Sequence, residues 1–138
     1  MRLTSFTDFG LRMLMRMAGE PTRAFSTAEF AKEFGLSRNH LAKVMQRLAE
    51  GGLIETRRGS GGGATLALPA DRIKLGAVVS ILEDGHSLVE CFTPESSSCT
   101  LHGRCRLTAR LRSAESAFLA DLNRGTLADI ALPPQRVP

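Results

Sequence analysis

Apolar side chains recur every three or four residues along residues 4–18, and this spacing predicts a first helix. Its apolar face is formed by Phe6, Phe9, Met13 and Met17. A polar stripe at four-residue spacing lies on another face and consists of Asp8, Arg12 and Arg16. For Arg16 we expect a solvated position, with the ion-pair and helix-dipole support of an exposed polar face.

Two further helices are predicted from their caps. Ser26 with Glu29 forms a capping box that starts one helix, and Gly35 ends it. Ser37 caps the next helix, which runs to about Glu50 and is closed by two glycines. The inner face of this helix is predicted to consist of Leu41, Val44 and Leu48. Two helices joined by a short turn with glycine form a helix-turn-helix unit, although a plain helical hairpin has the same pattern.

Two short stretches, residues 53–56 and 64–68, predict the strands of a hairpin. Their connection, RRGSGGG, is rich in glycine and begins with Arg57 and Arg58. A basic hairpin directly after a helix-turn-helix unit is typical of the wing of a winged helix. A nucleotide-binding loop is excluded, because the run lacks a Gly-Lys-Ser/Thr ending and joins two strands.

The rest of the chain predicts a short buried helix over residues 75–83 and a long helix over residues 104–123. A narrow apolar stripe on the long helix consists of Leu107, Leu111, Ala114, Phe118 and Leu122. Such a stripe favours a dimer helix over packing within one chain, which remains the alternative. Residues 93–98 are predicted to form a polar loop, and residues 126–130 a further turn of helix.

These elements predict a mainly α fold with a small β-hairpin wing. We expect a winged helix-turn-helix domain at residues 1–70. Residues 71–131 are expected to carry a cysteine-rich loop and a dimerisation helix, and residues 132–138 a loose tail.

Charge separates the two halves of the chain, which has 138 residues and a net charge of +4. Residues 36–63 contain five basic side chains against two glutamates, whereas residues 75–103 contain no Lys or Arg. The first half is therefore suited to an anionic partner such as nucleic acid. No apolar run approaches the ~20 residues of a membrane span, and no signal peptide is recognisable. We expect a cytoplasmic protein with reduced thiols and no membrane partner.

All three cysteines fall in one short segment, at Cys91, Cys99 and Cys105, with His102 among them. Thiolates gathered in a loop suit an iron–sulfur cluster or zinc, although three unrelated thiols are the simpler alternative. Either centre usually takes four ligands, so a fourth would come from another residue, a second subunit or an exogenous molecule.

Taken in this order, the helix-turn-helix, the RRGSGGG wing, the three-cysteine loop and the long last helix resemble the Rrf-two family of bacterial regulators. The resemblance covers about residues 1–131. Its start, LTSFTDFGLRML, and its end, SAESAFLADLNRGTLADI, are most similar to the nitric-oxide-sensing repressors of the family.

The resemblance implies a homodimer with crossed long helices and an iron–sulfur cluster on the three cysteines. It also implies that Asp8 from the partner subunit is the fourth ligand and that Arg12 lies beside it. We expect a 4Fe-4S cluster in preference to a 2Fe-2S cluster. The seven residues between Cys91 and Cys99 exceed the five that are more usual, and His102 is the alternative fourth ligand.

A second set of residues is predicted to contact double-stranded DNA with a palindromic operator. It consists of Ser37, Arg38, Asn39, His40, Lys43, Arg47, Arg57 and Arg58. Helix-turn-helix proteins read bases with the start of the second helix, while other basic side chains hold phosphates.

The function predicted from these features is a cluster-dependent repressor that releases DNA on nitric oxide. Sensing of iron or of cluster status is the first alternative, and a zinc or thiol regulator without iron is the second. No Ser-His-Asp set, paired carboxylates or nucleotide loop suggests an enzyme, and an iron–sulfur electron carrier conflicts with the winged-helix pattern.

Overall fold

The computed structural model describes residues 2–93, 95 and 98–134. Its helices and strands are α1 (Ser5–Gly19), α2 (Thr27–Phe34), α3 (Arg38–Glu50), β1 (Ile54–Arg57), β2 (Gly63–Leu66), α4 (Leu75–Leu82) and α5 (Arg106–Leu122). Short 3-10 turns are η1 (Ala70–Arg72), η2 (Glu90–Phe92) and η4 (Leu127–Ile130). The mainly α fold with a β-hairpin is confirmed. Residues 94, 96 and 97 of the predicted polar loop and residues 135–138 of the predicted tail lie outside the described residues.

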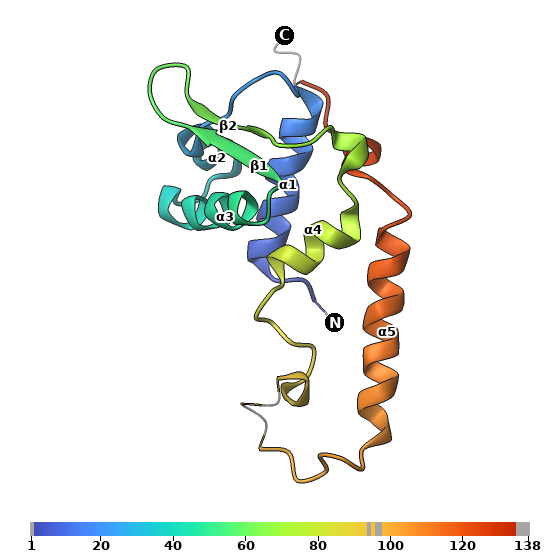
Figure 1. Cartoon of the computed structure of the whole chain (residues 1–138). Coiled ribbons are helices and arrows are strands. Elements are labelled where there is room, and N and C mark those ends of the chain that lie inside the picture. The colour runs from blue at the N-terminus through green and yellow to red at the C-terminus, as the bar shows by residue number, and fades with distance from the viewer. Residues whose placement is uncertain (1, 94, 96–97, 135–138) are drawn as a thin grey trace.

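Helix α1 runs through the middle of the main body (Figure 1). Helices α2 and α3 and the β1–β2 hairpin lie on one side of it, and α4 and α5 lie on the other. Helix α5 stands at the edge, where its contacts are mainly with α4. The segment that holds the cysteines extends away from the body and returns to the start of α5.

One hydrophobic core joins both halves of the chain. Its fully buried side chains include Met13, Leu14, Met17, Phe30, Leu41, Val44, Leu48, Ile73, Val78, Leu82 and Leu127. The predicted inner face of α3 is therefore confirmed. The residues predicted as two domains share this core, since α4 and η4 pack into it beside α1 and α3.

The predicted caps are present at the helix-turn-helix unit. The Ser26 side chain accepts from the N–H of Glu29, while the Glu29 carboxylate accepts from the N–H of Ser26 at 2.7 Å. Gly35 ends α2 with a φ of 66°, a left-handed conformation that glycine adopts without a steric penalty. Ser37 then caps α3, so the turn between the two helices is fixed by local chemistry.

The hairpin is attached to the segment before α2. Strands β1 and β2 pair antiparallel, with Ile54 opposite Leu66 and Arg57 opposite Gly63. Phe25 adds a bridge to Ala64, with N–H to carbonyl distances of 2.9 and 2.7 Å. A Cβ at Gly63 would lie 2.7 Å from the Phe25 carbonyl oxygen, and the φ of 139° also favours glycine. The base of the wing is therefore held by a close backbone contact.

The prediction of a solvated Arg16 is wrong. Its relative exposure is 8%, and its guanidinium lies 2.8 Å from Glu33 and 3.2 Å from Glu20. The guanidinium carbon also lies 5.5 Å from the ring centroid of Phe25. The polar stripe of α1 does not reveal this burial, because the carboxylate of Glu33 comes from α2 and draws the arginine into the interior.

Helix α5 differs from the other long helices, because none of its side chains is buried within the chain. Leu107 in the predicted apolar stripe is 61% exposed. Farther on, the N–H of Leu132 donates to the carbonyl of Met15 at 3.0 Å, so the first residue of the predicted tail is attached to α1. None of the helices that the structure describes is long and apolar enough to cross a membrane.

Candidate DNA-reading face and cysteine pocket

The start of α3 presents two exposed polar side chains, Arg38 and Asn39. The Ser37 side chain accepts from the N–H of His40 at 3.1 Å, and this cap fixes where α3 begins after the turn. One turn later, Lys43 is also exposed. These positions fit a helix that offers its first turns to a DNA groove.

His40 and Arg47 are placed differently from the other predicted DNA contacts. The His40 ring meets Phe9 at 5.4 Å and Phe6 at 6.3 Å between centroids, edge to face in both cases. Arg47 lies 3.4 Å from Asp84, an ion pair in which the arginine side chain is 37% exposed. His40 therefore faces α1. Arg47 links α3 to Asp84 in the segment that follows α4.

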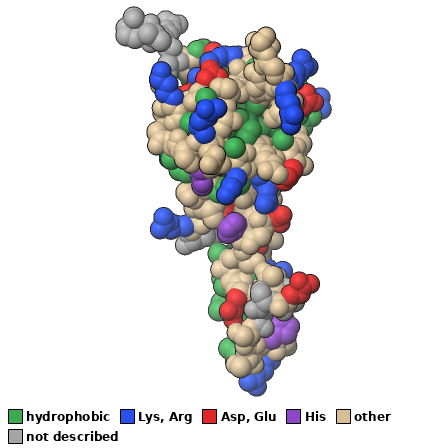
Figure 2. All heavy atoms as spheres, turned by 90° about the vertical axis from the view of Figure 1, so that its left-hand side faces the viewer, with side chains coloured by type: hydrophobic (Ala, Val, Ile, Leu, Met, Phe, Trp, Pro, Cys, Tyr) green, Lys and Arg blue, Asp and Glu red, His purple; other side chains and the backbone are tan. Residues whose placement is uncertain are grey.

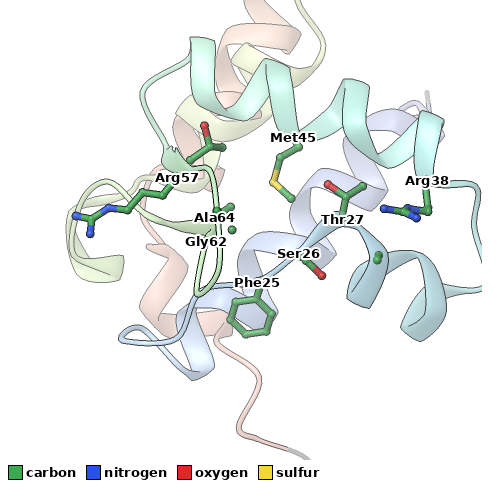
Figure 3. Close-up of a pocket in the computed structure, with 12 residues that line it drawn as sticks. Phe25, Ser26, Thr27, Arg38, Met45, Arg57, Gly62 and Ala64 are labelled. Atoms are coloured by element: carbon green, nitrogen blue, oxygen red, sulfur yellow. The ribbon is translucent and has the colours of Figure 1, made fainter.

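A hollow of about 370 Å³ lies between the start of α2, helix α3 and the wing. Arg38 and Arg57 lie at opposite ends of it, with Met45 and Thr27 between them (Figure 3). Arg58 is exposed on the loop that follows β1. Arg38 of α3 and Arg57 of the wing thus line one hollow, whereas Arg47 lies toward Asp84 and outside its lining.

Sequence reasoning missed the contribution of α2 to this face. Ser26, Thr27 and Ala28 line the hollow beside the wing. The capping box was the available signal, because it marks a helix start whose N–H groups attract anions. The pKa of Glu29 lies below its usual range, mainly because its carboxylate accepts from the Ser26 N–H, so this carboxylate serves the cap.

Figure 2 shows the side of the molecule that carries α2, α3 and the hairpin. Lys and Arg side chains are spread over the broad upper part of this face, and acidic side chains lie among them. Below it the molecule narrows into the extension formed by the cysteine loop and the start of α5. The candidate DNA face and the cysteines thus lie in different parts of the folded molecule.

The cysteines line a second hollow of about 340 Å³ at that narrow end. Its described lining consists of Cys91, Cys99, His102, Gly103, Cys105, Thr108, Ala109 and Arg112. Each of the three cysteine residues is half-buried. The predicted thiol ligands and the alternative ligand His102 therefore line the same hollow.

The first turn of α5 favours the thiolate form of Cys105, because it lowers the pKa of that thiol. Cys105 is the N-cap residue of α5. Hydrogen bonding from the Thr108 side chain, followed by the N–H groups of Thr108 and Leu107, lowers the pKa of the Cys105 thiol. Thr108 also lies 3.7 Å from the sulfur of Cys91. Arg112 adds a cation to the lining, and its guanidinium carbon is 4.4 Å from the ring centroid of Phe92. Thiolates are the form in which cysteine binds metals.

The donor set of this hollow fits a thiolate-held iron–sulfur cluster in its chemistry. Among the described residues, however, no three His, Cys, Asp or Glu side chains converge closely enough to hold a metal ion. Asp8 is absent from the lining and is paired with Arg12 on α1, at 2.6 Å between the carboxylate and the guanidinium. A ligand from Asp8 would therefore have to come from another copy of the chain.

The α2–α3 unit followed by the β1–β2 hairpin is a winged helix-turn-helix fold, an architecture of DNA-binding transcriptional regulators. The sequence pattern of the Rrf2 family, described as an iron-dependent transcriptional regulator, matches residues 3–132. The chain belongs to the Rrf2 family, and it is a regulator and not an enzyme.

Curated relatives show which members of the family the chain resembles. The chain is 43% identical to the HTH-type transcriptional regulator NsrR of Halalkalibacterium halodurans, over 94% of this chain and 90% of that protein. It is 41% identical to NsrR of Shouchella clausii, over 96% and 89% of the two chains. The resemblance to an NsrR-like member of the family is thereby confirmed.

Solved structures support the same fold. CymR, the global cysteine regulator of B. subtilis, superposes with a TM-score of 0.72 at 23% identity, over 95% of this chain and 96% of that chain. T. potens IscR superposes with a TM-score of 0.72 at 21% identity, over 94% of this chain and 85% of that chain. At these identities the likeness establishes the fold alone.

Proposed function

We propose that this regulator is a cytoplasmic, homodimeric repressor that depends on an iron–sulfur cluster and releases its operator on nitric oxide. The observation that carries the proposal is the hollow shared by Cys91, Cys99 and Cys105 in a chain 43% identical to an NsrR protein. When bound, the cluster, 4Fe-4S in preference to 2Fe-2S, would supply iron that reacts with nitric oxide, most readily where an oxygen replaces sulfur as ligand.

The thiols of the three cysteines are the proposed cluster ligands, with Asp8 of the partner subunit as the fourth. A neighbouring copy is supported by α5, which has no buried side chain in the single chain and exposes Leu107 and Ala114 of its apolar stripe. The other members of the stripe, Leu111, Phe118 and Leu122, are half-buried within the chain. Arg12 holds the Asp8 carboxylate through two contacts, at 2.6 and 3.2 Å, and so orients it. His102 lines the hollow within one chain and is the competing fourth ligand.

The side chains of the DNA face are proposed to have different roles. Arg38 and Asn39 are proposed to read base edges, because arginine pairs with guanine and asparagine with adenine through two hydrogen bonds. Lys43, Arg47 and Arg57 are proposed to hold phosphates. Arg58 at the wing suits a narrow minor groove.

Two copies of α3 related by a twofold axis require a palindromic operator. Its half-sites would lie about 34 Å apart or at a multiple of that distance. In this arrangement the N–H groups at the starts of α2 and α3, capped by Ser26 and Ser37, point to backbone phosphates.

Signal transmission is proposed to run through α1. Helix α1 carries Asp8 and packs directly against the reading helix α3. Release of Asp8 from the partner subunit would free the start of α1 and change the separation of the two reading helices. Coupling between two sites of about 1.4 kcal/mol already changes DNA affinity tenfold.

Sensing of iron supply or of cluster status is the second candidate, and the family description as iron-dependent favours it. The two candidates share the metal site and differ in the signal. A zinc or thiol regulator is the alternative without iron, and it would leave the three cysteines with a colourless metal or none.

Purification without oxygen tests the metal site. We expect a coloured protein with a sulfur-to-iron charge-transfer spectrum and nearly equal iron and sulfide per chain. Asp8→Ala should loosen the cluster more than His102→Ala does. A colourless protein, or one that carries zinc, would overturn the proposal, and a greater effect of His102→Ala would reassign the fourth ligand.

A further inference from the structure

The sequence predicts that His40 contacts DNA, because it is the third residue of the reading helix α3. Its side chain instead packs against α1. The ring planes of His40 and Phe9 meet at 85°, and those of His40 and Phe6 meet at 81°. Both centroid distances fall within the range of edge-to-face aromatic pairs. The imidazole is thus held by two rings of a neighbouring helix.

One of the two ring nitrogens is also turned inward. The Nε2 atom of His40 is buried and has no hydrogen-bond partner among the described residues. The neighbouring Arg38 and Asn39 are exposed. A side chain that reads a base must offer a donor or acceptor to the groove, and the Nε2 atom of His40 does not.

The rings that hold His40 belong to the same turn of α1 as Asp8. Phe9 follows Asp8 directly, and the guanidinium carbon of Arg12 lies 5.8 Å from the Phe9 ring centroid. Arg12 is paired with Asp8 at 2.6 Å. A continuous set of contacts therefore leads from the Asp8 carboxylate through Arg12 and Phe9 to the first turn of α3.

We propose that His40 is a positioning residue that couples the Asp8 end of α1 to the reading helix, and that it contributes no base contact. The inference rests on the proposed function, because the state of Asp8 is the signal to be transmitted. The backbone N–H of His40 donates to the Ser37 side chain. The ring contact therefore acts on a helical turn whose backbone is already fixed.

The test compares His40→Leu with wild type, using a DNA duplex that the wild-type chain selects from a random pool. Operator affinity is measured without oxygen for the cluster form and for the form without the cluster. We expect His40→Leu to reduce the ratio of the two affinities about tenfold, equivalent to about 1.4 kcal/mol of coupling. His40→Phe should restore the ratio because it keeps a ring against Phe9.

Base preference is the readout that separates a positioning role of His40 from base reading. We expect His40→Leu to keep the wild-type preference at every position of the duplex. Asn39→Ala, the matched change at the exposed neighbour, should alter the preference and leave the affinity ratio unchanged. Phe9→Leu tests the same contact from the α1 side and should also reduce the ratio.

The outcomes separate this inference from the proposed function. Equal affinity of the two wild-type forms would overturn the proposed function and the inference together. A wild-type ratio retained by both His40→Leu and Phe9→Leu would overturn the inference alone. A changed base preference in His40→Leu would return His40 to the base-reading residues.

Discussion

Glu83 accepts two hydrogen bonds from Thr4, from its N–H at 2.8 Å and from its hydroxyl at 2.9 Å. The residue after it, Asp84, lies 3.4 Å from Arg47 of the reading helix. The end of α4 therefore contacts both the N-terminal end of α1 and helix α3. This junction lies between the Asp8 region and the DNA face and contributes to holding them in one arrangement.

Stability at this junction should depend on pH. Burial acts to raise the pKa of Glu83, but hydrogen bonds from Thr7 and Thr4 outweigh it, and the pKa lies below its ordinary value. A lowered pKa stabilises the fold above the unfolded carboxyl value of about 4.3, and this contribution is lost as pH falls through the folded value. Because the group is partly solvated, we expect Glu83→Gln to cost about 1 kcal/mol at pH 7.

Urea unfolding of wild type and Glu83→Gln at pH 7 and at pH 3 checks this expectation. The difference in unfolding free energy should nearly vanish at the lower pH. Glu55→Gln, at an exposed carboxylate on β1, is the control and should show little difference at either pH. A pH-independent difference for Glu83→Gln would contradict the assignment.

Replacing Arg38 and Arg57 by alanine should change DNA binding in different ways. Loss of Arg38 is expected to relax specificity at one operator position by about 1–3 kcal/mol, because a base contact disappears. Loss of Arg57 should weaken binding to all sequences and lower the salt dependence of log Kd by about one unit, because a phosphate contact disappears. Binding to single-substituted operators over a salt series distinguishes the two, and identical profiles would refute the division.

The exposed part of the α5 stripe, at Leu107 and Ala114, should help to hold the dimer together. Ala114 lies in this stripe and is exposed in the single chain, so Ala114→Glu would place a charge in the interface without disturbing the core. We expect at least tenfold weaker dimerisation by sedimentation, with weaker operator binding. Ser116→Glu, at an exposed position about 200° around the helix from Ala114, is the matched control, and equal behaviour of the two variants would place the interface elsewhere.

Gly63 should be far less replaceable than Gly59. Both have positive φ, but a Cβ at Gly63 would meet the Phe25 backbone, whereas nothing lies within 4 Å of one at Gly59. We expect Gly63→Ala to cost more than about 2 kcal/mol and Gly59→Ala about 1 kcal/mol. Thermal unfolding checks the difference, and equal melting temperatures would mean that the bridge to Phe25 is dispensable.

Local chemistry made much of this fold predictable. The caps at Ser26 and Ser37, the stop at Gly35 and the apolar spacing of α3 each depend on residues within a few positions of one another. The strands were placed within about two residues for the same reason, since the glycine-rich run marks where the hairpin turns.

Contacts between distant residues were not predictable in this way. Arg16 is buried because Glu33, 17 positions later, approaches it. His40 has the sequence position of a DNA-contacting residue and the surroundings of a packing residue, because Phe6 and Phe9 reach it from another helix. Neither partner is marked by the local pattern around the residue it contacts.

The candidate metal site was predictable in its thiols only. Three cysteines within one loop identify the donor atoms, and the structure brings them to one hollow. The choice between Asp8 and His102 depends on a second copy of the chain, which neither the spacing of the cysteines nor a single chain determines.

Operator binding measured without oxygen, before and after nitric oxide, tests the central claim most directly. We predict tight binding by the cluster form and at least tenfold weaker binding after nitric oxide, with Cys99→Ser binding weakly in both conditions. Equal binding before and after nitric oxide, or a Cys99→Ser variant that binds and releases the operator as wild type does, would contradict the account.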